Sequence, residues 1–165
     1  MITRSSATLA LCILGMAPSP AQATWNGTQW GMSVDQVIAT IGESASKVRD
    51  ERDKRILNTH RLVTSHDTRE DLHYTVDYFF TPRDKRLTKV NLKPEPAECP
   101  IARAAFAVTL GEGDQQEKRI EIAPDRPAII EFKQVWQDPA GQGTVSYLSV
   151  SFDSDLRFCQ ILFEE

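Results

Sequence analysis

The sequence lacks most of the features by which an enzyme or a nucleic-acid-binding protein is recognised. It has no H-E-x-x-H zinc motif, no P-loop, no dinucleotide-binding fingerprint and no G-x-S-x-G nucleophile turn. It has no basic excess, because 19 Lys and Arg stand against 23 Asp and Glu, and this balance argues against a nucleic-acid partner. We therefore expect no catalytic residue, no cofactor and no metal.

Long apolar runs are also missing, except for one at the start of the chain. Arg4 precedes this run, two prolines interrupt it, and Ala21-Gln22-Ala23 provides the small residues of a signal-peptidase site. The run is about half of the roughly 20 residues that span a bilayer. We predict a signal peptide over residues 1–23 with cleavage after Ala23, no transmembrane segment in the mature chain, and a periplasmic location. Lipidation of Cys12 is the alternative, but Leu11 before it is not a small residue.

Cysteine is scarce, with three residues in the whole chain, and one of them falls within the predicted signal peptide. The remaining pair, Cys99 and Cys159, predicts a disulfide in an oxidising compartment. The alternative is two separate buried thiols. A redox-active pair is not favoured, because the close C-x-x-C spacing that lowers a thiol pKa is absent.

The clearest local signal is a short helix with both ends written into the sequence. Ser33 and Gln36 form a capping box, and Gly42 is the glycine expected after the last turn. An apolar stripe lies between them at helical spacing, at Val34, Val37, Ile38 and Ile41.

The rest of the chain predicts mainly strands. Alternating apolar residues over 72–80, the turn over 81–85 and the run over 87–92 predict a hairpin. A second helix is expected over 98–110, with its apolar stripe at Ile101, Ala105 and Val108. Further strands are expected over the following ranges: 56–63, 118–123, 128–136, 144–152 and 157–163.

These elements predict an α+β fold in which two short helices pack on an antiparallel β-sheet. The mature chain, residues 24–165, is long enough for one domain. Its two parts, 24–96 and 97–165, share one order of elements: a helix, a glycine stop, a polar segment and then antiparallel strands. We therefore expect a single domain with two possible helix-plus-strands halves.

The opening of the first helix resembles a known group of proteins. The Trp-Gly-Met-Ser motif at 30–33, followed by an acidic residue and Gly42, is similar to the opening of small bacterial periplasmic proteins. These resemble the outer-membrane assembly lipoprotein of the small-protein-A type and the repeats of the β-lactamase inhibitory protein. The resemblance implies a helix on a short antiparallel sheet and a binding role. The chain departs from the assembly lipoprotein at Thr24, where that protein has a lipid-modified cysteine.

Few residues are candidates for chemistry. His60, His66 and His73 lie near several carboxylates and could bind zinc, but surface histidines in a charged loop are the preferred interpretation. Trp30 is expected in the core, whereas Trp25 is expected to be exposed. Asn26-Gly27-Thr28 matches a glycosylation sequon but is interpreted as a turn.

The leading hypothesis is an exported, non-enzymatic module that binds another periplasmic protein or an envelope component. The alternative is a small periplasmic hydrolase or metal-dependent enzyme that uses the His60, His66 and His73 region. A third hypothesis is a structural or stress-protective protein with no single ligand.

Overall fold

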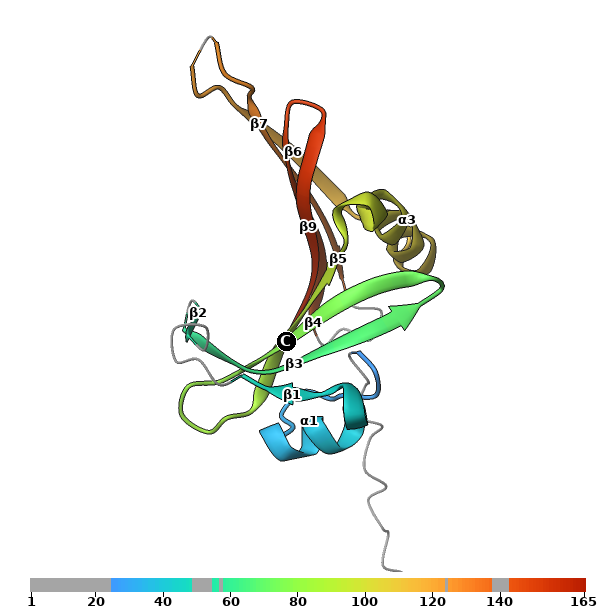
Figure 1. The fold of residues 1–165 in the computed structure, drawn as a ribbon, viewed down its shortest axis with the longest axis vertical. Helices are drawn as coiled ribbons and strands as arrows, with labels where there is room; N and C mark the ends of the chain where they lie inside the picture. Colours follow the sequence, from blue (N-terminus) through green and yellow to red (C-terminus); the bar gives the residue numbers. More distant parts are fainter. Residues whose placement is uncertain (1–24, 49–54, 57, 124, 138–142) are drawn as a thin grey trace, which may run out of the picture.

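One antiparallel β-sheet dominates the fold (Figure 1). The computed structural model describes residues 25–48, 55–56, 58–123, 125–137 and 143–165. The strands are β1 (Ser46–Lys47), β2 (Arg55–Ile56), β3 (Thr59–Arg69), β4 (Leu72–Phe80), β5 (Leu87–Pro94), β6 (Asp114–Ile120), β7 (Ile129–Gln137), β8 (Thr144–Phe152) and β9 (Asp155–Glu164). Their order in the sheet is β1-β3-β4-β5-β9-β8-β7-β6, and β2 also pairs with β3. The predicted signal peptide and its cleavage site after Ala23 lie outside the described residues.

Within the described residues, two short α-helices accompany the sheet, α1 (Val34–Ile41) and α3 (Cys99–Leu110), together with the 3-10 turns η1 (Gly42–Ser44) and η2 (Pro96–Glu98). The predicted α+β class is confirmed, but the emphasis on helices packed on a sheet is not. Helices of 8 and 12 residues cover little of a nine-stranded sheet, so the strands bury most of the core themselves. No helix among these residues is long and apolar enough to cross a membrane.

Helix α1 has the ends that the sequence predicts. Ser33 Oγ accepts a hydrogen bond from the backbone N–H of Gln36 at 3.3 Å, and Gln36 Oε1 accepts one from the N–H of Ser33 at 2.9 Å. Gly42 has φ +79°, a conformation that residues with a Cβ rarely adopt. Val37 is fully buried, so the predicted stripe does face the core.

The predicted hairpin is present as β4 and β5, whereas the strand predicted over 56–63 is wrong in extent. Strand β3 begins at Thr59 and continues to Arg69. It pairs with β4 from His60 opposite Phe80 to Arg69 opposite Leu72, so its partner sets its length. The residues in the second half of β3 are all polar, so the sequence shows no apolar alternation in that half of the strand.

The later strands lie close to their predicted ranges, although β6 begins at Asp114 rather than at 118. Every residue of β6 except Ile120 is exposed, which matches its place at the edge of the sheet. Charged side chains at such an edge discourage pairing with other chains. Residues 49–54, which are mostly charged in the sequence, and residues 138–142, between β7 and β8, fall outside the described residues.

The two parts of the chain meet in the middle of the sheet. Strand β5 pairs with β9 over a short ladder from Lys89 opposite Glu164 to Leu92 opposite Ile161. The strands before residue 97 therefore lie on one side of this ladder and the later strands on the other. Because Val90, Leu92 and Ile161 are fully buried, the ladder lies in the core.

The predicted disulfide between Cys99 and Cys159 is present, with the two Cα atoms 5.9 Å apart. Cys99 is the first residue of α3, and Cys159 lies in the middle of β9. Both residues are buried. The bridge therefore ties the start of α3 to the last strand.

We expect replacement of both cysteines by serine to lower the free energy of unfolding by about 4 kcal/mol. The reason is that the bridge closes a loop between residues 60 positions apart, which restricts the unfolded chain. Urea unfolding of the oxidised protein and of the double variant measures the difference. Equal midpoints and slopes for the two proteins would contradict the expectation.

Candidate functional site

The histidines considered as metal ligands are spread along β3 and β4. His60 and His66 belong to β3, so the expectation that they lie in a charged loop is wrong. His60 Nδ1 is 2.9 Å from Lys85 Nζ, at the opposite end of the strand pair from His73. Within the described residues, no group of three or more His, Cys, Asp or Glu side chains is placed to hold a metal ion. The strand pair therefore separates these histidines rather than collecting them.

His73 is exposed, as its position in the alternation predicts, and it pairs with Glu98 just before α3. One Glu98 carboxylate oxygen accepts a hydrogen bond from the His73 backbone N–H at 2.9 Å, and the other lies 3.0 Å from His73 Nδ1. The side-chain hydrogen bond and the charge of Glu98 raise the pKa of His73 above its ordinary value of 6.5. The same contacts lower the pKa of Glu98. The pair links the start of β4 to the residue that precedes Cys99.

An ion-pair cluster around the buried Asp77 lies on the opposite face of β4 from Tyr74 and Tyr78. Asp77 Oδ2 is 3.2 Å from Arg61 Nη1 and 2.8 Å from Lys93 Nζ. The alternation in the sequence places Asp77 away from the apolar face but does not predict its burial. The long side chains of Arg61 and Lys93 cover it. This cluster holds β3, β4 and β5 together and lines neither of the clefts described below.

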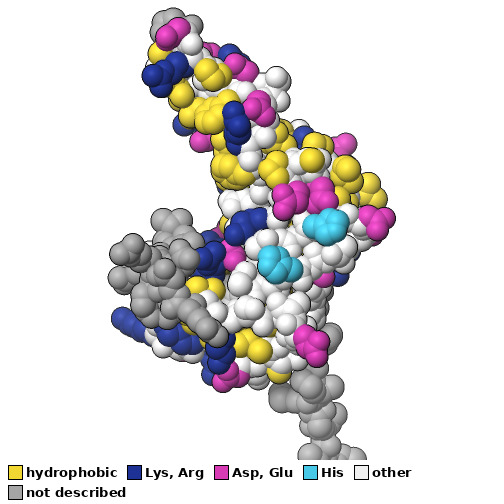
Figure 2. All heavy atoms as spheres, in the orientation of Figure 1, with side chains coloured by type: hydrophobic (Ala, Val, Ile, Leu, Met, Phe, Trp, Pro, Cys, Tyr) yellow, Lys and Arg dark blue, Asp and Glu magenta, His cyan; other side chains and the backbone are white. Residues whose placement is uncertain are grey.

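Helix α3 is apolar on its outer side as well as on its inner side. The predicted stripe at Ile101, Ala105 and Val108 is wrong, because Ile101 is 60% exposed and Val108 is 88% exposed. The buried residues are Cys99 and Ala102, since the disulfide fixes the rotation of the helix about its axis. Figure 2 shows hydrophobic side chains at the surface over α3. We call the exposed line of Ile101, Ala104 and Val108 the α3 ridge.

An aromatic cleft of about 470 Å³ lies on one side of the α3 ridge. Its floor is an aromatic cluster in which the Trp25 ring lies 5.6 Å from Tyr74, 6.2 Å from Phe106 and 6.1 Å from Phe163. The expectation that Trp25 is exposed is therefore wrong, and its side chain is 4% exposed. The Arg69 guanidinium also covers the ring at 4.2 Å from its centroid. Apolar contacts and cation–π attraction together explain this burial.

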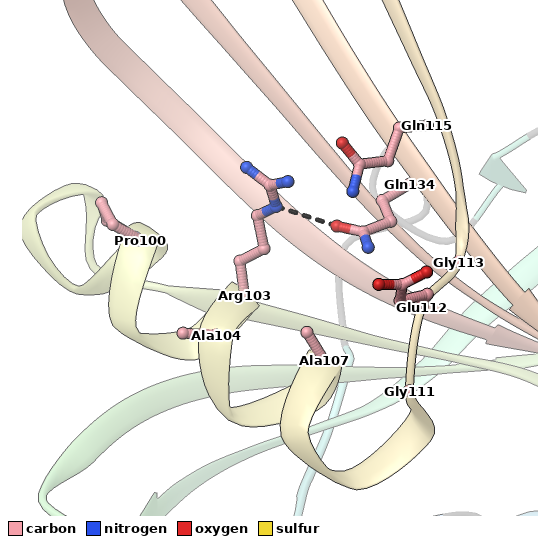
Figure 3. A pocket seen from close by; sticks show the side chains of 9 residues that line it. All are labelled: Pro100, Arg103, Ala104, Ala107, Gly111, Glu112, Gly113, Gln115 and Gln134. Atoms are coloured by element: carbon pink, nitrogen blue, oxygen red, sulfur yellow. Dashed lines mark hydrogen bonds between the residues drawn. The ribbon is translucent and has the colours of Figure 1, made fainter.

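A second cleft of about 660 Å³ lies on the other side of the ridge, between α3 and strands β6 and β7 (Figure 3). We call it the Arg103 cleft. Arg103 projects from α3 toward the sheet, and its Nε donates a hydrogen bond to Gln134 Oε1 at 2.9 Å. Its guanidinium also lies 4.0 Å from the centroid of the Phe132 ring. Gln115 and Glu112 complete the polar lining.

The far end of α3 is fixed by Trp136, which is buried under the connection to β6. Its Nε1 donates a hydrogen bond to the Gly111 carbonyl oxygen at 2.9 Å. A Cβ atom at Gly113 would lie 2.8 Å from the Trp136 ring, so the close approach of the chain requires glycine there. Both clefts therefore border a helix that is fixed at each end.

Two features of the sequence indicate the contact between Arg103 and Gln134, although the apolar periodicity of α3 does not. Arg103 is the single charged residue among the 12 of α3. Gln134 is a polar residue at an inward-facing position of β7, between Phe132 and Trp136, and it is 2% exposed. A lone charge in an apolar helix and a lone amide in an apolar strand face suggest a contact across the core.

The predicted turn at Asn26 and Gly27 is confirmed, because the Thr28 backbone N–H donates to the Trp25 carbonyl oxygen at 3.0 Å and both turn residues have positive φ. Trp30 packs partly buried against the core. The turn places Trp25 in the floor of the aromatic cleft.

The chain matches no protein-family model, and no curated protein or solved structure shows significant similarity to it.

We expect Glu98→Gln to bring the pKa of His73 down toward 6.5, because a neutral amide no longer stabilises the imidazolium. The raised pKa of His73 adds stability that is complete below pH 6.5 and is lost as the pH rises through that pKa. The lowered pKa of Glu98 adds stability that is lost as the pH falls through it. The stability difference between the wild type and the variant should therefore be largest in mildly acidic solution.

NMR titration of the His73 ring measures the first effect, and urea unfolding at several pH values measures the second. Glu112→Gln, on the other side of α3, is the control and should leave the pKa of His73 unchanged. A His73 pKa that Glu98→Gln does not lower would contradict the assignment.

Proposed function

We propose that this chain is an exported, non-enzymatic binding protein that takes a partner protein of the cell envelope over the α3 ridge. The observation that carries the proposal is the exposure of Ile101, Ala104 and Val108 on a helix in which Arg103 and Thr109 are the only polar residues. A helix with this composition is ordinarily buried on every side. A second protein surface would complete its burial.

The rigidity of α3 supports a binding role. The Cys99–Cys159 disulfide holds its first turn, and the Trp136 hydrogen bond to Gly111 holds its end. The Arg103 hydrogen bond to Gln134 holds its middle. Because the helix is already ordered, a partner loses less conformational entropy when it binds.

The surroundings of the ridge also suit a protein partner. The aromatic cleft on one side offers an apolar surface, and the Arg103 cleft on the other offers polar groups. Interfaces of this kind have an apolar centre and a polar surround. The ridge with its two clefts therefore has the composition expected of a docking surface.

The periplasmic location is part of the same proposal. The signal-like residues 1–23 and the disulfide both suit an oxidising compartment outside the cytoplasm. The likeness of the Trp-Gly-Met-Ser opening to small-protein-A-type and β-lactamase-inhibitory proteins is a further reason for proposing a binding role. In the same way we infer that the chain consists of two helix-plus-strands halves joined through β5 and β9.

We expect the double change Ile101→Ser and Val108→Ser to reduce capture of the partner at least tenfold. A few residues near the centre of an interface contribute most of its binding energy, and serine at both positions removes apolar surface from that centre. Serine and the replaced residues differ little in helix propensity, so the stability of the free protein should change by less than about 1 kcal/mol. Ile122→Ser is the matched control, because Ile122 is also exposed but lies beyond β6.

The measurement uses the oxidised, processed protein on a solid support, envelope extract as the source of partners, and quantitative mass spectrometry. The proposal requires a partner that the wild type and the Ile122→Ser control retain and that the double variant loses. Retention of every bound protein by the double variant would contradict it.

A further inference from the structure

We propose that the Arg103 cleft binds a carboxylate group of a polypeptide that lies along α3. The inference rests on the proposed function for its partner, but the carboxylate site can be tested without that partner. The carboxylate comes from a chain terminus or from an acidic side chain, and both sources offer the same planar pair of oxygens.

The guanidinium of Arg103 is already oriented. Its Nε donates to Gln134 Oε1 at 2.9 Å, and its Cζ lies 4.0 Å from the centroid of the Phe132 ring. Gln134 is buried at 2% exposure, so it holds Nε in a fixed position. An arginine held in this way has little conformational freedom left to lose when a ligand binds.

The two Nη groups of Arg103 are the part of the guanidinium that this arrangement does not use. They form no hydrogen bond or ion pair with any residue that the structure describes. Figure 3 shows them beside the open cleft, with Gln115 and Gln134 on the sheet side. Two parallel N–H groups match the two oxygens of a carboxylate, and such charge-assisted pairs are among the stronger hydrogen bonds.

The walls of the cleft leave room for a peptide group. Ala104 and Ala107 line it from the helix, and Gly111 and Gly113 line it from the connection to β6. A cleft of about 660 Å³ is within the range of natural ligand sites. The small side chains on this side of α3 therefore let a partner approach the guanidinium closely.

Among the described residues that line this cleft, Glu112 is the one acidic residue. It forms no ion pair with Arg103 in the described part of the chain, although both border the same space. Because Glu112 does not pair with Arg103, the guanidinium stays accessible. The Glu112 carboxylate would nevertheless repel an incoming carboxylate. Removal of this charge should therefore strengthen binding.

A purely structural role for Arg103 would account for the Nε hydrogen bond and the contact with Phe132, but not for the unused Nη pair. The two roles predict different results with a small probe. If Arg103 is only structural, binding of a small probe does not depend on the charge of the probe. If Arg103 forms a carboxylate site, only a probe with a carboxylate binds.

The test is an NMR titration of the oxidised, processed protein with three peptides. N-acetyl-trialanine carries a terminal carboxylate, its C-terminal amide carries none, and an amide-capped Ala-Glu-Ala peptide carries only an acidic side chain. The resonances that report on the cleft are the Gly111 and Gly113 amides and the Trp136 indole N–H. Saturable shifts with either carboxylate peptide, and none with the uncharged amide, are expected, and the preferred peptide identifies the source of the carboxylate.

Variants then assign the binding to Arg103. Arg103→Gln should abolish the saturable shifts, and Arg103→Lys should weaken binding at least fivefold, because lysine lacks the planar fork. Glu112→Gln, which leaves every contact of Arg103 in place, should strengthen binding about two- to fivefold. Equal shifts with the uncharged amide, or unchanged affinity in Arg103→Gln or in Glu112→Gln, would overturn the proposal.

The Ile101→Ser and Val108→Ser variant distinguishes this inference from the proposed function. Short peptides that reach only the Arg103 cleft should bind to this variant with the same affinity as to the wild type. Loss of the envelope partner with retained peptide binding supports both proposals. Retained partner capture with retained peptide binding contradicts the proposal that the α3 ridge binds the partner, but it does not contradict the carboxylate site.

Discussion

The attachment of α3 to the second half of the sheet is the constraint on which the rest of the structure depends. The Cys99–Cys159 bridge sets where the helix begins and which side faces β9. The hydrogen bonds from Arg103 to Gln134 and from Trp136 to Gly111 then fix its middle and its end. Once these points are fixed, the helix cannot rotate to bury its remaining apolar residues. The exposed ridge is therefore a direct consequence of the attachment.

The same constraint explains why two different clefts border one helix. Aromatic residues from β4, β9 and the N-terminal turn pack under one side of α3, so the space beside them is apolar. On the other side the glycines of the α3–β6 connection keep the chain close to Trp136, which leaves room above Gln134. A surface with an apolar centre, an apolar cleft and a cleft that presents the Arg103 guanidinium suits a polypeptide partner with an acidic group.

The elements that the sequence predicts correctly are those whose causes are local. The capping box of α1 needs only Ser33 and Gln36, and the β4–β5 hairpin needs only alternation and a turn. The disulfide could be predicted because two cysteines remain after the signal-like segment. The burial of Trp25 and the length of β3 depend on partners far away in the chain, and no local pattern records them. The orientation of α3 follows from the disulfide rather than from its own periodicity, because the apolar residues of this helix are spread around it and mark no single face. Its exposed ridge and the two clefts were therefore beyond the reach of sequence patterns.

The most direct test of the account is hydroxyl-radical footprinting of the oxidised protein, alone and in envelope extract. It measures how fast each exposed side chain is oxidised. In buffer, Ile101, Val108, Ile122 and Phe158 should all react, because all four are exposed. In extract, we expect protection of Ile101 and Val108 with unchanged oxidation of Ile122 and Phe158. Unchanged oxidation of Ile101 and Val108, with or without protection at the other two residues, would contradict the claim that α3 is the binding surface.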